Sequence, residues 1–203
     1  MITIINTELG NLQSIYRMLL KLEFEVVVTS ESSIIKKANK IILPGVGHYK
    51  KGMEKLNQLN LVPEINSLVK NNKIPILGIC LGMQLLFEKS EEGKINGLGL
   101  LKGGVKLIKP QDKSYKVPHM GWNTINVSQK SRLFCKINNP RFYFVHSYKV
   151  IPEDEKIVSS YVDYGDKICS SVEKGNIFGV QFHPEKSHKF GLQLLRNFGN
   201  LNA

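Results

Sequence analysis

The stretch Ile74-Pro-Ile-Leu-Gly-Ile-Cys-Leu-Gly82 decides the fold, because an apolar run passes there directly into an amphipathic segment. The run predicts a buried strand and the following segment a helix, so Cys80 falls at their junction. Gly78 and Gly82 flank the cysteine and leave room for a tight turn. This arrangement is a G-x-nucleophile-x-G elbow with cysteine in place of serine. Most free cysteines are inert core residues, but the start of a helix favours the thiolate, and Cys80 is therefore a candidate nucleophile.

Around this elbow, the first half of the chain alternates predicted strands with predicted helices. Asn11 is placed to cap the first helix, whose apolar residues recur at helical spacing. Near-continuous apolar strands separated by helices predict a mainly parallel open sheet flanked by helices on both faces. The predicted strands are 2–5, 25–29, 40–43 and 74–79, and the predicted helices are 12–22, 50–59, 62–71 and 80–88.

The second half of the chain changes period and consists of short strands separated by turn signals. Strands are expected at 105–108, 122–127, 142–150, 157–164, 167–172 and 177–182, followed by a final helix at about 187–201. No linker, repeat or low-complexity tract divides the sequence. We therefore expect a single α/β domain over residues 1–203, in which the parallel sheet has an antiparallel extension.

The composition restricts the classes of function. The chain has 203 residues, a formal net charge of +11 and 42% hydrophobic residues, as expected of a globular protein. Lysine supplies 24 of the 28 cations and is dispersed, which indicates a solvated surface and not a nucleic-acid site. No apolar run is long enough to cross a membrane, and the three cysteines suggest neither a disulfide framework nor a zinc site. We expect a reduced, cytoplasmic protein with no metal and no cofactor.

A second chemical motif, Gln181-Phe-His-Pro-Glu185, ends the last predicted strand. Side chains two residues apart in an extended segment point the same way, so Glu185 can hold the imidazole of His183. A carboxylate that fixes the imidazole tautomer is the usual support of a catalytic base. Alone, His-x-Glu is more often a surface pair, but after a cysteine elbow it completes a candidate triad of Cys80, His183 and Glu185.

A third motif, Pro44-Gly-Val-Gly47, follows the third predicted strand. In elbow enzymes one oxyanion donor is the N–H of the residue after the nucleophile, and another comes from the loop after strand three. Leu81 fits the first role, and Gly45, Val46 and Gly47 form the loop for the second. Taken by itself, this loop is an ordinary strand-to-helix turn.

Together these motifs resemble those of the class I triad glutamine amidotransferases. The matching segments are Pro44-Gly-Val-Gly47, Gly78-Ile-Cys-Leu-Gly-Met-Gln84 and Val180-Gln-Phe-His-Pro-Glu185. Two more, Lys116-Val-Pro-His-Met-Gly-Trp-Asn123 and Tyr143-Phe-Val-His-Ser-Tyr148, are similar to segments of the glutaminase subunits of imidazole glycerol phosphate synthase. The resemblance spans essentially the whole chain, and it implies the class I glutamine amidotransferase fold.

The resemblance also implies roles for individual residues. Cys80 attacks the carboxamide of L-glutamine to give a thioester, His183 moves the proton and Glu185 orients His183. The residues that match glutamine-binding positions of the family are Gln84, Glu92, His146, Ser147 and Tyr148. Tyr143 and Lys186 match positions that face the synthase partner. Trp122 and Asn123 are further candidates for the partner interface, and with His119 they are interface or structural residues and not catalytic ones.

A partner follows from the chemistry and from the resemblance. Ammonia in water at neutral pH is mostly ammonium, so a glutaminase that delivers ammonia needs a sheltered exit. The related subunits form a heterodimer with a (β/α)8-barrel cyclase. That cyclase uses the ammonia to form imidazole glycerol phosphate and AICAR in histidine biosynthesis.

One segment, Asn6-Thr-Glu-Leu9, departs from the acidic-aromatic-glycine run that is usual in the family. Glu8 takes the position of the glycine. This departure leaves open a paralogous subunit that supplies ammonia for an amidino group on a surface-polysaccharide sugar. A thiol hydrolase of other substrates and a binding module without catalysis are further alternatives.

Overall fold

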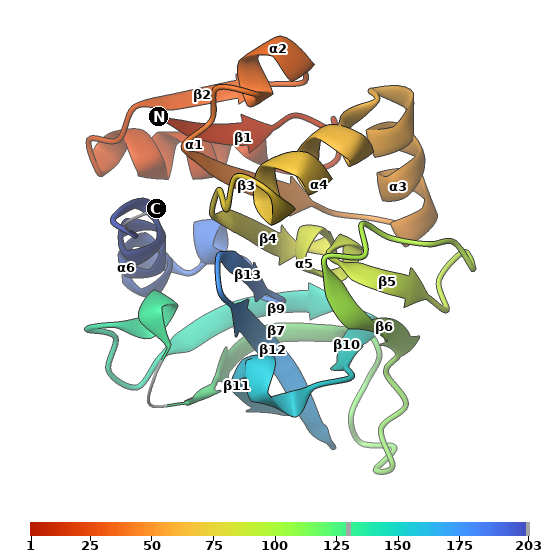
Figure 1. Cartoon of the computed structure of the whole chain (residues 1–203). Coiled ribbons are helices and arrows are strands. Elements are labelled where there is room, and N and C mark those ends of the chain that lie inside the picture. Colours follow the sequence, from red (N-terminus) through yellow and green to blue (C-terminus); the bar gives the residue numbers. More distant parts are fainter. Residues whose placement is uncertain (129–130, 202–203) are drawn as a thin grey trace.

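Five parallel strands form the centre of the molecule. The computed structural model describes residues 1–128 and 131–201, and its largest sheet has the strand order β2-β1-β3-β4-β13-β12-β11-β8. The first five strands in this order are parallel, and the last three join them antiparallel. A three-stranded sheet of order β10-β6-β5 and an antiparallel pair, β7-β9, complete the strands (Figure 1). The predicted α/β fold, mainly parallel with an antiparallel extension in the second half, is confirmed.

The elements follow one another in a fixed order. They are β1 (Ile2–Ile5), α1 (Leu12–Lys21), β2 (Val26–Thr29), α2 (Ser32–Ile35), β3 (Lys40–Gly45), α3 (Tyr49–Gln58), α4 (Leu61–Lys70), β4 (Ile76–Cys80), α5 (Leu81–Leu85), β5 (Phe87–Ser90), β6 (Leu101–Leu107), β7 (His119–Thr124), β8 (Asn126–Val127), η1 (Arg132–Phe134), β9 (Arg141–His146), β10 (Tyr148–Pro152), η2 (Glu155–Ile157), β11 (Val158–Asp163), β12 (Lys167–Lys174), β13 (Ile177–Val180), η3 (Pro184–Lys186) and α6 (His188–Gly199). The η elements are short 3-10 helices. As predicted, the side chain of Asn11 caps α1 by accepting the N–H of Ser14.

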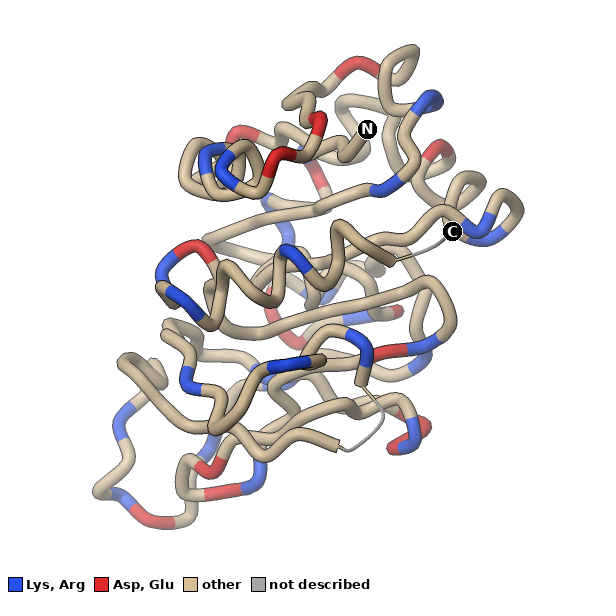
Figure 2. The backbone as a smooth tube through the Cα atoms, turned by 90° about the vertical axis from the view of Figure 1, so that its left-hand side faces the viewer, with Lys and Arg blue, Asp and Glu red and all other residues tan. Residues whose placement is uncertain are grey.

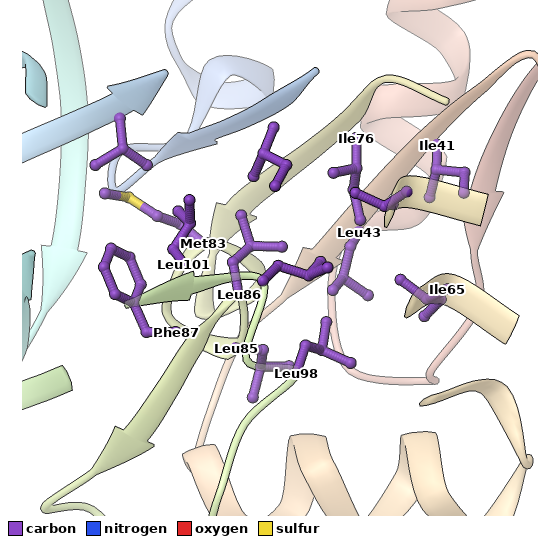
Figure 3. Close-up of a cluster of buried hydrophobic side chains, with 14 of the residues drawn as sticks. Ile41, Leu43, Ile65, Ile76, Met83, Leu85, Leu86, Phe87, Leu98 and Leu101 are labelled. Atoms are coloured by element: carbon purple, nitrogen blue, oxygen red, sulfur yellow. The ribbon is translucent and has the colours of Figure 1, made fainter. Parts of the chain in front are cut away.

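Each central strand buries side chains on both faces, and the helices cover those faces. Ile41 and Leu43 of β3 pack in a cluster with Ile65 of α4, as Figure 3 shows. Ile42, between them, packs in a second cluster with Ile15 of α1. Burying a side chain of this size contributes roughly 1.5–3 kcal/mol relative to leaving it in water. The helices α3 and α4 thus lie over one face, and α1 and α6 over the other (Figure 1).

The helix predicted for 80–88 is wrong in its second half. The helix α5 ends at Leu85, and the chain continues as the strand β5. The chain turns back after β5, and backbone hydrogen bonds from the N–H of Leu98 to Leu85 O and from the N–H of Leu100 to Leu86 O, both at 2.9 Å, hold the returning segment against the end of α5. Phe87 is fully buried in this position (Figure 3). Tertiary packing therefore overrides the helical propensity of this segment.

Two runs predicted as single strands are each divided between sheets. The run 122–127 contributes to β7, which pairs with β9, and to β8, which pairs with β11. The run 142–150 breaks at Ser147, so that β9 pairs with β7 whereas β10 pairs with β6. In both cases the apolar pattern continues while the pairing partner changes. A pattern of hydrophobicity reports burial and not the identity of the neighbouring strand.

The cations are distributed over the whole described chain. In Figure 2, Lys and Arg positions occur on helices, strands and loops from one end of the molecule to the other, interleaved with Asp and Glu. This distribution agrees with the dispersed lysines of the sequence. Within residues 1–128 and 131–201, no helix has the length and apolar character needed to cross a membrane.

Candidate active site

Cys80 lies in a strained turn between the central sheet and a helix. It ends β4 and precedes α5, and its backbone has φ 54° and ψ −108°. L-residues rarely adopt such angles, which cost on the order of 1–3 kcal/mol and persist only where the surroundings impose them. A Cβ on Gly82 would overlap the carbonyl oxygen of Leu43, and one on Gly78 would crowd the backbone of Gly82. The two glycines of the motif are therefore required for the helix to pack against the sheet.

A pocket of about 370 Å³ opens beside this turn. It brings together residues from all the motifs that the sequence indicated, namely Val46, Gly47, Cys80, Leu81, Gln84, Glu92, His146, Ser147, Tyr148 and His183. Pro118 and Val145 complete the lining; both lie in segments that matched the family, although neither was predicted as a site residue. Pockets of this size bind small molecules.

His183 and Glu185 form a buried pair behind the pocket. The Nδ1 atom of His183 lies 2.7 Å from Oε1 of Glu185, and their side chains are 2% and 4% exposed. The backbone N–H of His183 donates to the carbonyl of Tyr143 in β9 at 2.9 Å. Ser187 connects the same two segments, since its hydroxyl donates to His183 O and accepts the N–H of Tyr143. Ser187 was not predicted as a site residue, and it helps to fix the position of the His183 backbone relative to β9.

The charge environment of His183 favours its protonated form. Burial alone lowers the pKa of the imidazole, but the nearby Cys80 sulfur and the Glu185 carboxylate outweigh burial and raise the pKa of His183 to about 10. An anionic neighbour stabilises a cation most strongly where water is excluded. The arrangement thus favours an imidazolium next to the Cys80 sulfur. The Nε2 atom of His183 is buried without a hydrogen-bond partner among the described residues, so it is available for proton exchange at the pocket.

The turn after β3 borders the pocket, but its backbone is hydrogen-bonded to the segment after β1. The N–H of Val46 donates to the carbonyl oxygen of Leu9 at 3.2 Å, so this predicted oxyanion donor is already occupied. Gly45 packs closely against Leu81, so that a Cβ added at Gly45 would lie only 3.1 Å from the Leu81 side chain. Leu81 is the first residue of α5, where N–H groups have no acceptor within the helix. The N–H of Leu81 therefore has no acceptor within the helix, whereas the N–H of Val46 can reach an oxyanion only if the turn moves.

The residues predicted to hold glutamine are grouped along one wall of the pocket. The Nε2 atom of Gln84 donates to the carbonyl of Tyr148 at 3.2 Å. The carboxylate of Glu92 accepts the N–H of Tyr49 at 2.7 Å, which anchors it at the start of α3. Ser147 and Tyr148 contribute from the bend between β9 and β10. The wall therefore presents a fixed carboxylate beside the 146–148 bend, which suits the charged end of an amino acid.

His146 lines the pocket as the last member of a buried histidine pair. Its Nδ1 lies 2.8 Å from the carbonyl of Tyr148, and its Nε2 lies 2.9 Å from Nδ1 of His119. Asn123 completes the row, with Nδ2 at 2.7 Å from Nε2 of His119. Burial lowers the pKa of His119 to about 4 and that of His146 to about 3. All four ring nitrogens are engaged, and among the described residues no group of three or more His, Cys, Asp or Glu is arranged to hold a metal ion.

The four predicted partner-facing residues lie close together on the β7–β9 pair and η3. The ammonium of Lys186 lies 5.5 Å from the ring centre of Tyr143, and the rings of Trp122 and Tyr143 are 6.2 Å apart. Asn123 follows Trp122 in β7, but its side chain points to the opposite face of the strand, toward the buried His119. All four side chains are half-buried or exposed. This patch adjoins the pocket through Tyr143, whose backbone is bonded to His183.

This geometry agrees with the comparison of the whole chain with known proteins. A family model described as glutamine amidotransferase class-I matches residues 3–200. A solved structure described as PurLQS from Thermotoga maritima has the same fold, with a TM-score of 0.72 at 20% identity over 97% of this chain and 96% of that chain. The chain belongs to the class-I glutamine amidotransferases.

More similar relatives narrow the class. Imidazole glycerol phosphate synthase subunit HisH 2 of Methanococcus maripaludis is 48% identical over 199 residues, which cover 98% of both chains. Imidazole glycerol phosphate synthase subunit HisH of Oceanobacillus iheyensis is 50% identical over 200 residues, again 98% of both. Within the class, the chain is thus a member of the HisH family.

Proposed function

We propose that the chain is the glutaminase subunit of an imidazole glycerol phosphate synthase and supplies ammonia for histidine biosynthesis. The observation that carries the proposal is the convergence of Cys80 and His183 at one pocket, with Glu185 bonded to His183 from behind. Cys80 is held there by a strained turn, and His183 is held by a carboxylate at 2.7 Å. A nucleophile, a base and an orienting group are the parts that acyl transfer from a carboxamide requires.

The chemistry proceeds in two half-reactions. The thiol proton of Cys80 passes to Nε2 of His183, and the sulfur attacks the side-chain carboxamide carbon of glutamine. The carbon–nitrogen bond then breaks, and the nitrogen leaves as ammonia with the proton that His183 held. Water, deprotonated by His183, attacks the thioester, and the sulfur leaves with its electron pair to regenerate Cys80. Glutamate is released.

The walls of the pocket suit the two ends of glutamine. The carboxylate of Glu92 complements the α-ammonium group, and the backbone of 146–148 is placed to bind the α-carboxylate. Gln84 is rigidly oriented by its bond to Tyr148. The N–H groups of Leu81 and of the 45–47 turn would bind the oxyanion that forms on attack.

The ammonia needs a protected route to a second active site. A (β/α)8-barrel cyclase that binds as a heterodimer over Tyr143, Lys186 and Trp122 would provide that route, because this patch adjoins the pocket through Tyr143; Asn123 would support the patch from behind through His119. The unpaired cysteines Cys80, Cys135 and Cys169 fit a reducing compartment such as the cytoplasm. The amidino-sugar alternative has no support among the relatives described above, which are HisH subunits.

Glu8, the departure that motivated that alternative, has a local structural account. Its backbone has φ 60°, a region that favours glycine, and its N–H donates to the side chain of Asn6 at 2.9 Å. Its carboxylate lies 2.7 Å from Nζ of Lys55. The position thus keeps a backbone conformation that a glycine would adopt, and Glu8 is not among the residues that line the pocket.

The proposal is tested with Cys80→Ala in the complex with its cyclase partner. We expect glutamine-dependent synthesis to fall to background, because the nucleophile is lost, while synthesis from added ammonium salt continues. Cys135→Ala is the matched control, since Cys135 is exposed and does not line the pocket, and it should keep both activities. Persistence of glutamine-dependent activity in Cys80→Ala would refute the proposal. Absence of glutamate formation by the wild-type complex would indicate a thiol hydrolase of another substrate.

A further inference from the structure

Gln181 touches the sulfur of Cys80 from beneath the pocket. Its side-chain Nε2 lies 3.7 Å from Sγ of Cys80, a hydrogen-bond distance for an N–H group and a sulfur. Gln181 is fully buried, and its backbone N–H donates to the carbonyl of Ser170 in β12 at 2.9 Å. The amide is therefore a fixed group, held by the central sheet, in contact with the atom that reacts.

The direction of the Gln181 amide follows from a chain of donors and acceptors. The carbonyl of Tyr148 can only accept, so the atom of Gln84 that approaches it at 3.2 Å is the nitrogen Nε2. The same nitrogen lies 3.0 Å from the side chain of Gln181, which must therefore present its oxygen, Oε1. The Nε2 of Gln181 is left to face Cys80. The backbone of the 146–148 bend thus fixes the polarity of a group that it does not touch.

The contact differs from those of the other groups near the sulfur. Val145 presents a carbonyl oxygen 4.0 Å from Sγ, which can accept the S–H of the thiol but repels a thiolate. His183 exchanges a proton with the sulfur and loses its positive charge when it does so. The amide of Gln181 stays neutral and keeps its N–H at every stage. Its N–H therefore favours the thiolate over the thiol, whether His183 is charged or neutral.

We propose that Gln181 is a further catalytic residue of the glutaminase reaction, whose side-chain N–H stabilises the Cys80 thiolate. This inference rests on the function proposed above. The N–H acts twice: it stabilises the sulfur anion before attack, and again when the thioester breaks and the sulfur leaves with the electron pair. The thiolate then recovers a proton from His183, so that atoms and charge balance. Hydrogen bonds to charged groups typically contribute about 1.5–3 kcal/mol, which corresponds to a change of roughly 10- to 100-fold in rate.

The test compares Gln181→Met, which keeps the length and removes the donor, with Gln181→Glu, which keeps the shape and places an acceptor against the sulfur. Gln193→Met, on the partly exposed side of α6, is the matched control. All variants carry Cys135→Ser, so that iodoacetamide labelling reports on the pocket thiol. The third cysteine, Cys169, is buried and burial raises its pKa to about 12.

In the assembled synthase, we expect Gln181→Met to lower kcat for glutamine about 10- to 100-fold with little change in KM. The pH midpoint of Cys80 labelling should rise by about one unit or more, and further in Gln181→Glu. Synthesis from ammonium salt should be unchanged, as it should be in Gln193→Met for all readouts. An unchanged labelling midpoint in a folded Gln181→Met or Gln181→Glu protein would overturn the inference.

A measurement on the wild-type chain covers the case in which both variants fail to fold. In a protein labelled with nitrogen-15, the NMR chemical shift of the Gln181 side-chain amide proton should change with pH. The midpoint of this change should equal the pH midpoint of Cys80 labelling, and the change should be absent in Cys80→Ala. Lack of any such shift in the wild-type chain would also refute the role. These outcomes are separate from the test of the glutaminase itself, which depends on whether Cys80→Ala retains glutamine use.

Discussion

The backbone N–H of Val46 donates to the carbonyl oxygen of Leu9 at 3.2 Å, and this bond holds the 44–47 turn away from an oxyanion. Val46 lines the pocket and is 42% exposed, so only a backbone rearrangement separates it from the role that its motif implies. Gly47 follows it with φ 95°, which gives the turn a residue able to change conformation at low cost. The Val46 N–H, which we propose as an oxyanion donor, is thus bonded within the turn region and not directed to the pocket.

We therefore expect the isolated chain to be a weak glutaminase that its partner activates. Loss of a single oxyanion donor typically costs about 100- to 1000-fold in kcat, and binding of the cyclase should restore a factor of this order. Glutamate formation is measured with the chain alone and with the partner in excess, and Cys80→Ala gives the background. Equal rates with and without the partner would show that the Val46–Leu9 bond does not limit catalysis.

The pair of His183 and Glu185 leads to a prediction about pH. Glu185→Gln removes one of the two neighbours that raise the pKa of His183 to about 10. The imidazolium should then lose its proton at lower pH, so the alkaline limit of glutamine-dependent activity should move downward. Loss of the orienting carboxylate should also reduce kcat by about 100- to 10,000-fold. Profiles of kcat against pH test both effects, and an unmoved alkaline limit would argue against this origin of the pKa shift.

The elbow leads to a prediction about stability. Gly82→Ala should destabilise the fold by more than about 3 kcal/mol, because the new methyl group meets backbone that cannot retreat. Gly99→Ala is the control, since Gly99 has φ 60° but open space around it, and it should cost only about 1–2 kcal/mol. Urea denaturation of both variants gives the difference. Similar costs would mean that the close approach of the Leu43 carbonyl does not determine the glycine at position 82.

The elbow was predictable because its cause is local. A nucleophile between two glycines at a strand-to-helix junction allows few conformations, and the structure has Cys80 in one of them. The parallel strands of the first half were predictable for a similar reason, since each is apolar on both faces. The division at Ser147 was not, because β9 and β10 continue one apolar pattern while they pair with different strands.

The contacts that support the site depend on pairing that a sequence does not encode locally. His119 meets His146 because β7 and β9 pair in a register that places these two residues opposite each other. Gln181 meets Cys80 because β13 lies beside β4 in the sheet, although the two strands are far apart in the chain. A resemblance between motifs identifies which residues belong to the site. It does not show which side chains support them from below.

The buried histidine pair gives a prediction about acid sensitivity. His119 and His146 have lowered pKa values, about 4 and about 3, because burial disfavours their charged forms. The unfolded chain takes up protons near the ordinary value of 6.5, so each histidine should reduce stability as pH falls below that value, by up to about 1.4 kcal/mol per pH unit. The raised pKa of His183 acts in the opposite sense, and its contribution should be lost as pH rises from about 6.5 toward 10. The contributions of these three histidines should therefore decline on both sides of a maximum near pH 6.5.

His119→Phe separates the contribution of the pair. Phenylalanine keeps the stacking of His119 between Phe144 and Tyr164, whose ring centres lie 4.6 and 4.0 Å away. It leaves Nε2 of His146 and the amide of Asn123 unpaired, so we expect a loss of about 1–3 kcal/mol at pH 7. The decline of stability toward pH 5 should nevertheless be shallower than in the wild type, because one buried titrating group is gone. Urea denaturation at pH 7, 6 and 5 measures both effects, with His48→Asn as a control at an exposed histidine that caps α3. If the stability of His119→Phe falls as steeply toward pH 5 as that of the wild type, the histidine pair is not the cause of the decline in stability at acid pH.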